Sequence, residues 1–143
     1  ISGRIFDKPT FATPDKKANF KMVNIPQIKD EKYKFRMASI RSEGQFNTII
    51  YEEHDSFRKV NHRWTVLMNI NDMLSLNLKE KDKVTIQNNI GSMEHVTVKR
   101  FNLPPGNVAT YFPESNILIP KDIDLRSNTP SFKSIFVDVI PVS

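Results

Sequence analysis

The sequence predicts a mainly β domain, folded as a closed or nearly closed barrel with short helical insertions. Several short segments alternate apolar and polar residues, as strands with one buried face do. Pro, Gly, Asn and Asp separate these segments, and only one or two stretches have helical spacing. A barrel is the natural arrangement of such strands, because closure removes exposed sheet edges.

Length and composition indicate one domain with a core of its own. The 143 residues are the usual size of a domain and suffice for a hydrophobic core without cross-links. Cysteine is absent, which excludes disulfides, thiolate metal sites and cysteine nucleophiles. The net charge of +5 suits anionic partners of many kinds but is too small to indicate nucleic acid.

Targeting segments are not evident in the sequence. No apolar run approaches the ~20 residues of a membrane-spanning helix, and the first residues do not resemble a signal peptide. We therefore expect a cytoplasmic protein without a membrane span. The missing initial Met suggests a piece cut from a longer chain, with a processed mature protein as the alternative.

Residues 1–30 are expected to form an extended N-terminal arm, and residues 31–143 the barrel domain. Three prolines lie among Lys and Asp residues in the arm, and three phenylalanines provide scattered apolar anchors. We expect the arm to lie across the domain.

The first strand is expected at residues 32–40, where Tyr33, Phe35 and Met37 alternate with two basic residues. A polar loop follows at residues 41–48. It carries a guanidinium group, hydroxyls and amides, and Gly44 permits a turn or a close approach of the backbone to a ligand. Such groups suit a phosphate or a polar heterocycle. The alternative is a solvated turn with an Asx or Ser/Thr cap.

A strand and a helix are expected in the middle of the chain. Residues 64–68 are a compact apolar run that predicts a short buried strand, with Trp64 in the core. Asn69 follows and can cap a helix in which Met73 and Leu74 begin an amphipathic pattern.

A hairpin and a final strand are expected beyond this helix. Strands at residues 83–87 and 94–101 are joined by a turn that contains Gly91. Residues 108–114 are expected to be a loop or a short helix, because the preceding Pro-Pro-Gly cannot continue a strand. The last strand is expected at residues 134–140.

Three segments together resemble one known family. They are Ser-Glu-Gly-Gln-Phe-Asn-Thr at 42–48, Met-Asn-Ile-Asn-Asp-Met-Leu-Ser-Leu-Asn-Leu-Lys-Glu-Lys-Asp-Lys-Val at 68–84, and Pro-Pro-Gly-Asn-Val-Ala-Thr-Tyr-Phe-Pro-Glu-Ser-Asn-Ile-Leu-Ile-Pro at 104–120. They are similar to the C-terminal molybdopterin dinucleotide-binding domain of the formate dehydrogenase-like molybdopterin oxidoreductases.

This resemblance implies a double-psi β-barrel of the aspartate decarboxylase type. It implies that the barrel forms one wall of a tunnel holding bis(molybdopterin guanine dinucleotide) with Mo or W. The partners it implies are the upstream domains of a parent oxidoreductase and an electron-transfer subunit.

The resemblance also implies which residues bind the cofactor. The loop at residues 41–48 matches the family's dinucleotide-contacting loop. Asn69 and Asp72 match an Asn/His-x-x-Asp element to which we assign guanine recognition, since a carboxylate accepts from the guanine amino and ring N–H groups together. Asn116 matches the Asn of a Pro-Glu-Ala-Asn element, and Lys133 a basic residue near the last strand. The expected cofactor-binding residues are Arg41, Ser42, Gln45, Phe46, Asn47, Thr48, Asn69, Asp72, Asn116 and Lys133.

No catalysis is expected from this chain alone, because the resemblance places the metal's protein ligand and any iron–sulfur cysteines upstream. His54, His62 and His95 lack the spacing of a metal site and are expected on the surface or in loops. Two other functions are open. A double-psi interaction module would present an apolar groove, and nucleic-acid binding would require basic residues interleaved with aromatics, whereas Lys and Arg are scattered here.

Overall fold

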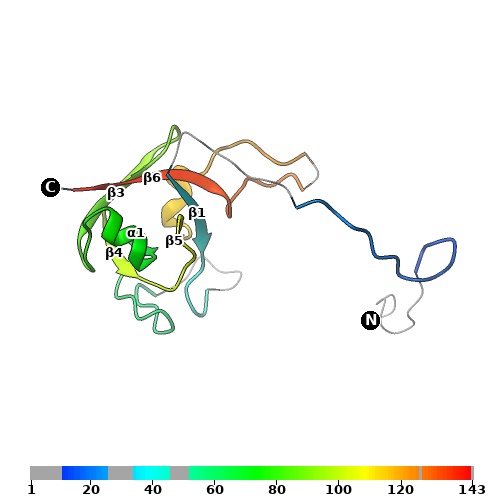
Figure 1. Ribbon diagram of the computed structural model, residues 1–143, viewed down its shortest axis with the longest axis horizontal. Coiled ribbons are helices and arrows are strands. Elements are labelled where there is room, and N and C mark those ends of the chain that lie inside the picture. The colour runs from blue at the N-terminus through cyan, green and yellow to red at the C-terminus, as the bar shows by residue number, and fades with distance from the viewer. Residues whose placement is uncertain (1–10, 26–33, 46–51, 126, 143) are drawn as a thin grey trace.

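A computed structural model describes residues 11–25, 34–45, 52–125 and 127–142 of the chain. Within them lie six strands, one α-helix and one 3₁₀ helix (Figure 1): β1 Phe35–Ile40, β2 Thr65–Met68, α1 Ile70–Ser75, β3 Lys83–Gln87, β4 Ser92–Arg100, β5 Asn107–Tyr111, η1 Glu114–Leu118 and β6 Ile135–Pro141. In the described residues, no helix is long and apolar enough to span a membrane.

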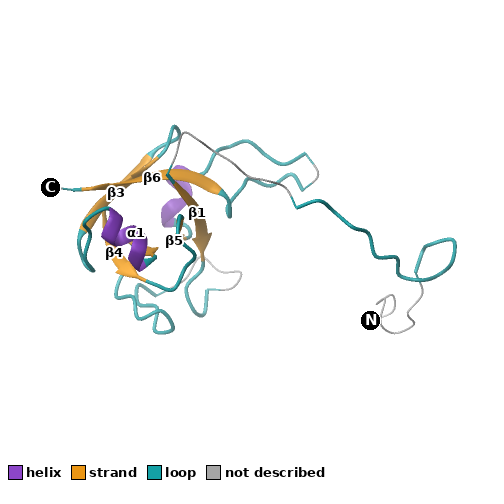
Figure 2. Ribbon diagram, viewed as in Figure 1, coloured by secondary structure: helices purple, strands orange, loops and turns teal. Residues whose placement is uncertain are grey.

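The strands close into a barrel in the order β1-β5-β2-β4-β3-β6. β1 pairs with β5 and β2 with β4 in parallel, while the other four pairings are antiparallel. In the view of Figure 2, α1 is drawn in front of the ring of strands. The prediction of a mainly β closed barrel with short helical insertions is therefore confirmed.

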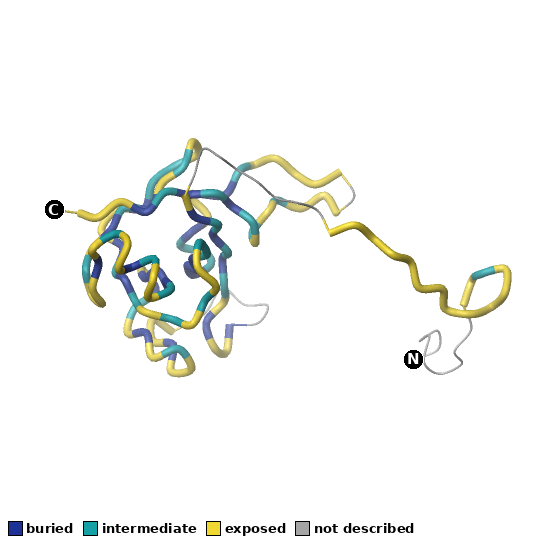
Figure 3. The backbone as a smooth tube through the Cα atoms, in the orientation of Figure 1, coloured by how far each residue is buried: buried dark blue, intermediate teal, exposed yellow. Residues whose placement is uncertain are grey.

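Alternation along the strands builds the barrel core. In β1 every second residue is buried, beginning with Phe35 and Met37. α1 adds Met73 to the same core cluster, which also contains Val66 and Met68 from β2. Figure 3 shows the buried residues gathered in the barrel. Each large apolar side chain buried there contributes about 1.5–3 kcal/mol relative to exposure.

α1 begins where the sequence predicts. Asn69 has extended backbone angles, and its side-chain oxygen accepts a hydrogen bond from the backbone N–H of Asn71, as an N-cap does. The helix ends early, at Ser75, and only Met73 of its residues is buried, while Leu74 is exposed. The strands predicted at residues 83–87 and 94–101 are present as the antiparallel pair β3 and β4.

The prediction of a loop or short helix at residues 108–114 was wrong, because β5 occupies most of this segment. Pro104 and Pro105 lie in the turn before the strand, where no ladder donor is needed. Gly106 has φ +76° and completes the turn, and its carbonyl accepts from the backbone N–H of Arg36. β5 then pairs with both β1 and β2.

Two further expectations were wrong. Trp64 is 37% exposed at the barrel rim, where its indole N–H donates to the Glu94 carbonyl at 2.7 Å. This hydrogen bond explains why the ring stays outside the apolar core. Residues 11–25 form no helix or strand, and in Figure 1 they extend away from the barrel instead of lying across it. Phe20 of this segment is fully exposed.

Candidate functional site

An open recess lies at the carboxyl end of β1. We call it the Arg41 recess. Its volume is about 600 Å³, within the usual range of ligand pockets. Its walls come from β1 and from segments far apart in the sequence: Ser39, Ile40, Arg41, Arg58, Phe112, Phe132 and Lys133.

Three cationic side chains line this recess. The Arg41 guanidinium lies 5.7 Å from the centre of the Phe112 ring. Lys133 is exposed, and its ammonium group donates to the Ser39 carbonyl, which fixes it at the edge of the recess. Arg58 forms an ion pair with Asp55 at 2.7 Å, so part of its charge is balanced by that carboxylate.

Two aromatic rings give the recess an apolar side. Phe112 and Phe132 pack edge to face, with ring centres 6.4 Å apart and planes at 87°. Phe132 also packs against the barrel core, so the pair is held in place. Cations beside aromatic faces are suited to a ligand that combines phosphate with a heterocycle.

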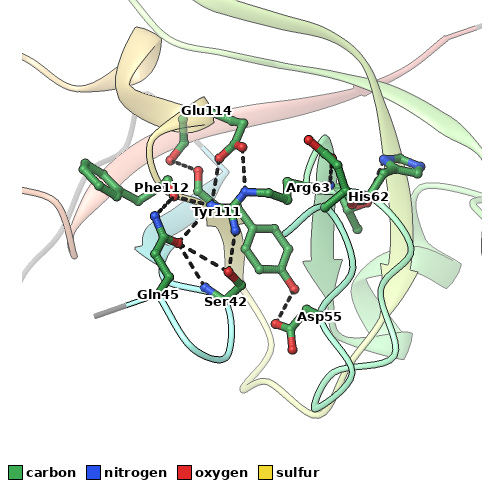
Figure 4. A network of polar contacts seen from close by, with 11 residues as sticks. Ser42, Gln45, Asp55, His62, Arg63, Tyr111, Phe112 and Glu114 are labelled. Carbon is green, nitrogen blue, oxygen red and sulfur yellow. Dashed lines mark hydrogen bonds and ion pairs between the residues drawn. The ribbon is translucent and has the colours of Figure 1, made fainter. Parts of the chain in front are cut away.

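Arg63 organises the loop beneath this recess and is only 1% exposed. Figure 4 shows its guanidinium group between the 41–45 loop and the start of η1. It donates to Ser42 Oγ at 2.5 Å, to Gln45 Oε1 at 3.0 Å and to the Phe112 carbonyl. Its Nε donates to Glu114 at 2.7 Å. The charge of this buried arginine is thus met by a carboxylate and by neutral acceptors.

Tyr111 connects this network to a second carboxylate. Its ring lies 5.0 Å from the Arg63 guanidinium carbon, and its hydroxyl donates to Asp55 at 2.9 Å. Burial and the neighbouring Asp55 carboxylate raise the pKa of Tyr111 above its ordinary value. Burial acts against ionisation of Asp55, but hydrogen bonds from Arg58 and Tyr111 outweigh it and lower the pKa of that carboxyl group.

Four of the predicted cofactor-binding residues lie together at this end of the barrel. Arg41 and Lys133 line the recess itself. Ser42 and Gln45 are buried behind it, where both hydrogen-bond to Arg63. Their side chains therefore shape the loop from within. Phe46, Asn47 and Thr48 lie outside the described residues.

Asn69 and Asp72 lie at the opposite end of the barrel. Asp72 accepts from the Gly106 backbone N–H at 2.8 Å, and the Asn69 amide donates to the Leu103 carbonyl. Gly106 precedes β5 and bonds to Arg36 at the start of β1. Arg36 and Arg41 are separated by roughly 17 Å of extended strand at about 3.3 Å per residue. The hydrogen bonds of Asn69 and Asp72 thus join α1 to the 103–106 turn.

Asn116 is exposed on η1 and is not among the residues that line the Arg41 recess. Its backbone N–H donates to Pro113 and its carbonyl accepts from Ile119. The structure gives its side chain no hydrogen-bond partner among the described residues.

No cluster of three or more potential metal ligands occurs in the described part of the chain. His62 is held by hydroxyls: its Nε2 lies 3.1 Å from Thr97 Oγ1. With Arg41 and Lys133 at the Arg41 recess, the arrangement can bind and orient an anionic ligand, and the described residues include no nucleophile paired with a base at this recess.

Sequence reasoning missed Arg63, Arg58, Phe112 and Phe132. Arg63 precedes the predicted buried strand and is indistinguishable by pattern from the charged residues before it. Its position directly before an apolar run was a signal, because a residue next to a buried strand can be buried together with that strand.

Comparison with protein families decides what kind of domain this is. The model of the family described as "Molydopterin dinucleotide binding domain" matches residues 35–136, from the start of β1 into β6. This chain belongs to the molybdopterin dinucleotide-binding domain family.

Relatives of the domain occur in several bacteria. The chain is 31% identical to the "Uncharacterized oxidoreductase Rv2900c" of Mycobacterium tuberculosis (strain ATCC 25618 / H37Rv), over 96% of this chain and 19% of that protein. It is 30% identical to the protein YdeP of Escherichia coli (strain K12), over 90% of this chain and 19% of that protein. The chain thus spans about a fifth of the length of these curated relatives.

The barrel also matches a solved structure. Acetylene hydratase from Pelobacter acetylenicus superposes with a TM-score of 0.57 and 13% sequence identity, over 77% of this chain and 18% of that chain. At this level of identity the likeness concerns the fold alone.

Proposed function

We propose that this chain is the C-terminal cofactor-binding domain of a molybdenum or tungsten oxidoreductase related to the formate dehydrogenases. In this proposal the cofactor is bis(molybdopterin guanine dinucleotide), and the barrel is a double-psi barrel that forms one wall of its binding tunnel. The domain binds and orients the dinucleotide and does not carry out the chemistry itself.

The observation that supports this most strongly is the placement of Arg41 over the ring of Phe112, beside Lys133. Arg41 directly follows β1 and is the first residue of the loop that the sequence resemblance assigns to the dinucleotide. Arg41 supplies a planar fork that matches phosphate oxygens, and Lys133 adds a second positive charge. Phe112 and Phe132 offer apolar surface for a heterocycle.

The residues of the Arg41 recess fit a dinucleotide better than an apolar peptide. A protein-interaction module of this fold was expected to present an apolar groove, whereas this recess is lined by three cations. When bound, the cofactor supplies a redox-active metal centre. The chain's own residues supply charge for the phosphates and a rigid loop held by Arg63.

The relatives named above are about five times longer than this chain, so the remaining walls of the site belong to other parts of a longer protein in this proposal. The test is to purify that longer protein anaerobically. Metal content is then measured by mass spectrometry, and the oxidised pterin is measured by its fluorescence. We expect molybdenum or tungsten together with pterin in the longer protein and neither in this chain alone. A well-folded longer protein that contains neither would contradict the proposal.

A further inference from the structure

A second recess lies beside β4, which passes between β2 and β3, and His62 is one of its lining residues. We call it the lysine recess. Its volume is about 360 Å³, and it shares no lining residue with the Arg41 recess. In Figure 4 the His62 ring points away from the Arg63 guanidinium, although the two residues are neighbours in sequence. Residues 59–62 line this recess, whereas Arg58 lines the Arg41 recess.

Four lysines converge on this recess: Lys59, Lys81, Lys83 and Lys99. One carboxylate, Glu80, lines it with them and pairs with Lys99 at 3.2 Å. Three lysine charges are thus left uncompensated by the lining residues, in a chain whose net charge is +5. Lys59 and Lys81 have no side-chain hydrogen bond or ion pair with any other described residue.

Hydrogen bonds hold several polar groups of the recess in place. Lys83 donates to Thr97 Oγ1 at 2.8 Å, and the same hydroxyl lies 3.1 Å from His62 Nε2. Thr65, which is 3% exposed, donates to the His62 carbonyl at 2.7 Å. An ammonium group has three hydrogens, so Lys83 keeps two for a ligand after binding Thr97. The Thr97 hydroxyl therefore positions Lys83, while Lys59 and Lys81 belong to turns that line the recess.

Charge and size together select the ligand. Lysine ammonium groups bind phosphate as point charges, without the fixed bidentate geometry of an arginine fork, so several of them can surround a chain of phosphoryl groups. The volume lies at the small end of the range for ligand pockets, too small for a folded partner segment. We propose that the lysine recess binds a chain of two or three phosphoryl groups, either free or as the phosphate part of a nucleotide.

The test titrates this chain with inorganic tripolyphosphate, followed by calorimetry and by amide chemical shifts. The variant K81Q/K83Q removes two ligand-facing charges. The matched control, K34Q/K121Q, removes two exposed charges that line neither recess. Circular dichroism confirms that each variant is folded. We expect the first variant to weaken binding by roughly three- to tenfold per lysine and the control to change it by less than about twofold.

Shift changes should centre on Thr97, His62 and Lys83 and should weaken with added salt. A comparison of tripolyphosphate with ATP as the titrant identifies the source of the phosphates. Equal affinity for tripolyphosphate and ATP supports recognition of phosphoryl groups alone, and tighter binding of ATP supports a nucleotide. Absence of binding, equal weakening by both double variants, or tighter binding of poly-glutamate than of tripolyphosphate would overturn the proposal.

The lysine recess is also separable from the cofactor site. In the longer protein, K81Q/K83Q should leave pterin content unchanged, because neither lysine lines the Arg41 recess. Loss of pterin from this variant would overturn the assignment of a separate site.

Discussion

Arg63 Nε donates to Glu114 Oε1 at 2.7 Å and so joins the residue two positions before β2 to the first residue of η1. The same guanidinium group binds Ser42 and Gln45 from the loop after β1. One buried cation thus connects three segments that are distant in sequence. The Arg41 recess depends on this connection, because Phe112 lies between β5 and η1 and its carbonyl also accepts from Arg63.

Replacing Arg63 by Ala should strongly destabilise the barrel. The change leaves Glu114, Ser42 and Gln45 without their shared donor, and breaking a buried ion pair on one side costs about 3–5 kcal/mol. Because Glu114 is 16% exposed, we expect the lower end of this range, about 3 kcal/mol, in urea unfolding. The exposed Arg100→Ala is the control and should change stability by less than about 0.5 kcal/mol. A loss below about 1 kcal/mol for Arg63→Ala would contradict this account.

Tyr111 should make stability fall in alkaline solution. Its ordinary pKa is 10.0, and burial together with Asp55 raises the pKa in the folded state. The folded protein therefore keeps a proton that the unfolded chain loses above pH 10, so unfolding becomes easier as the pH rises beyond that value. Tyr111→Phe should be less stable than the wild type near pH 8 and should approach it above pH 10. Parallel pH profiles of the free energy of unfolding would contradict this prediction.

Gly91 tests the packing of the β3–β4 turn against η1. A Cβ atom at this position would lie 2.5 Å from the backbone oxygen of Ile117, a contact that backbone movement alone can relieve. We expect Gly91→Ala to cost about 1–3 kcal/mol, measured by thermal unfolding. Gln87→Ala, at an exposed position in the preceding strand, serves as the control. Equal unfolding temperatures for the two variants would show that η1 does not pack as described.

Asp72 distinguishes a structural role from guanine recognition. In the structure its carboxylate accepts from the Gly106 N–H, so Asp72→Asn should destabilise the domain by about 1–2 kcal/mol. Stability is measured on this chain and pterin content on the longer protein. We expect reduced stability with the dinucleotide retained. Unchanged stability with loss of the dinucleotide would support the sequence-based assignment of this residue to guanine recognition.

The sequence predicted the barrel because its strands alternate clearly. β1, β3 and β6 have one buried face, and the run before Asn69 is fully buried in β2. It did not predict β5. The prolines before that strand suggested a break, although a turn needs no ladder donor and tolerates them.

The candidate site was predicted only in part, for a physical reason. Arg41 and Lys133 carry charge that any sequence pattern reveals. Arg63 lies before β2 and Phe112 lies after β5. Both reach the end of β1 only because β5 pairs with β1 and with β2 in the closed barrel. Ser42 and Gln45 were correctly singled out as polar residues of one loop, but the structure turns both side chains inward toward Arg63. Local sequence does not encode such long-range contacts.

Pterin content of the longer protein carrying Arg41→Ala tests the central claim most directly. Arg41 is exposed, so its replacement should leave folding intact while removing the planar cation over Phe112. Arg100→Ala, which removes an equal charge away from the Arg41 recess, is the control. Our account predicts that pterin and metal fall together by at least about fivefold in Arg41→Ala, as for loss of one charge-assisted hydrogen bond, and are unchanged in the control. Full pterin and metal content in a folded Arg41→Ala protein would contradict it.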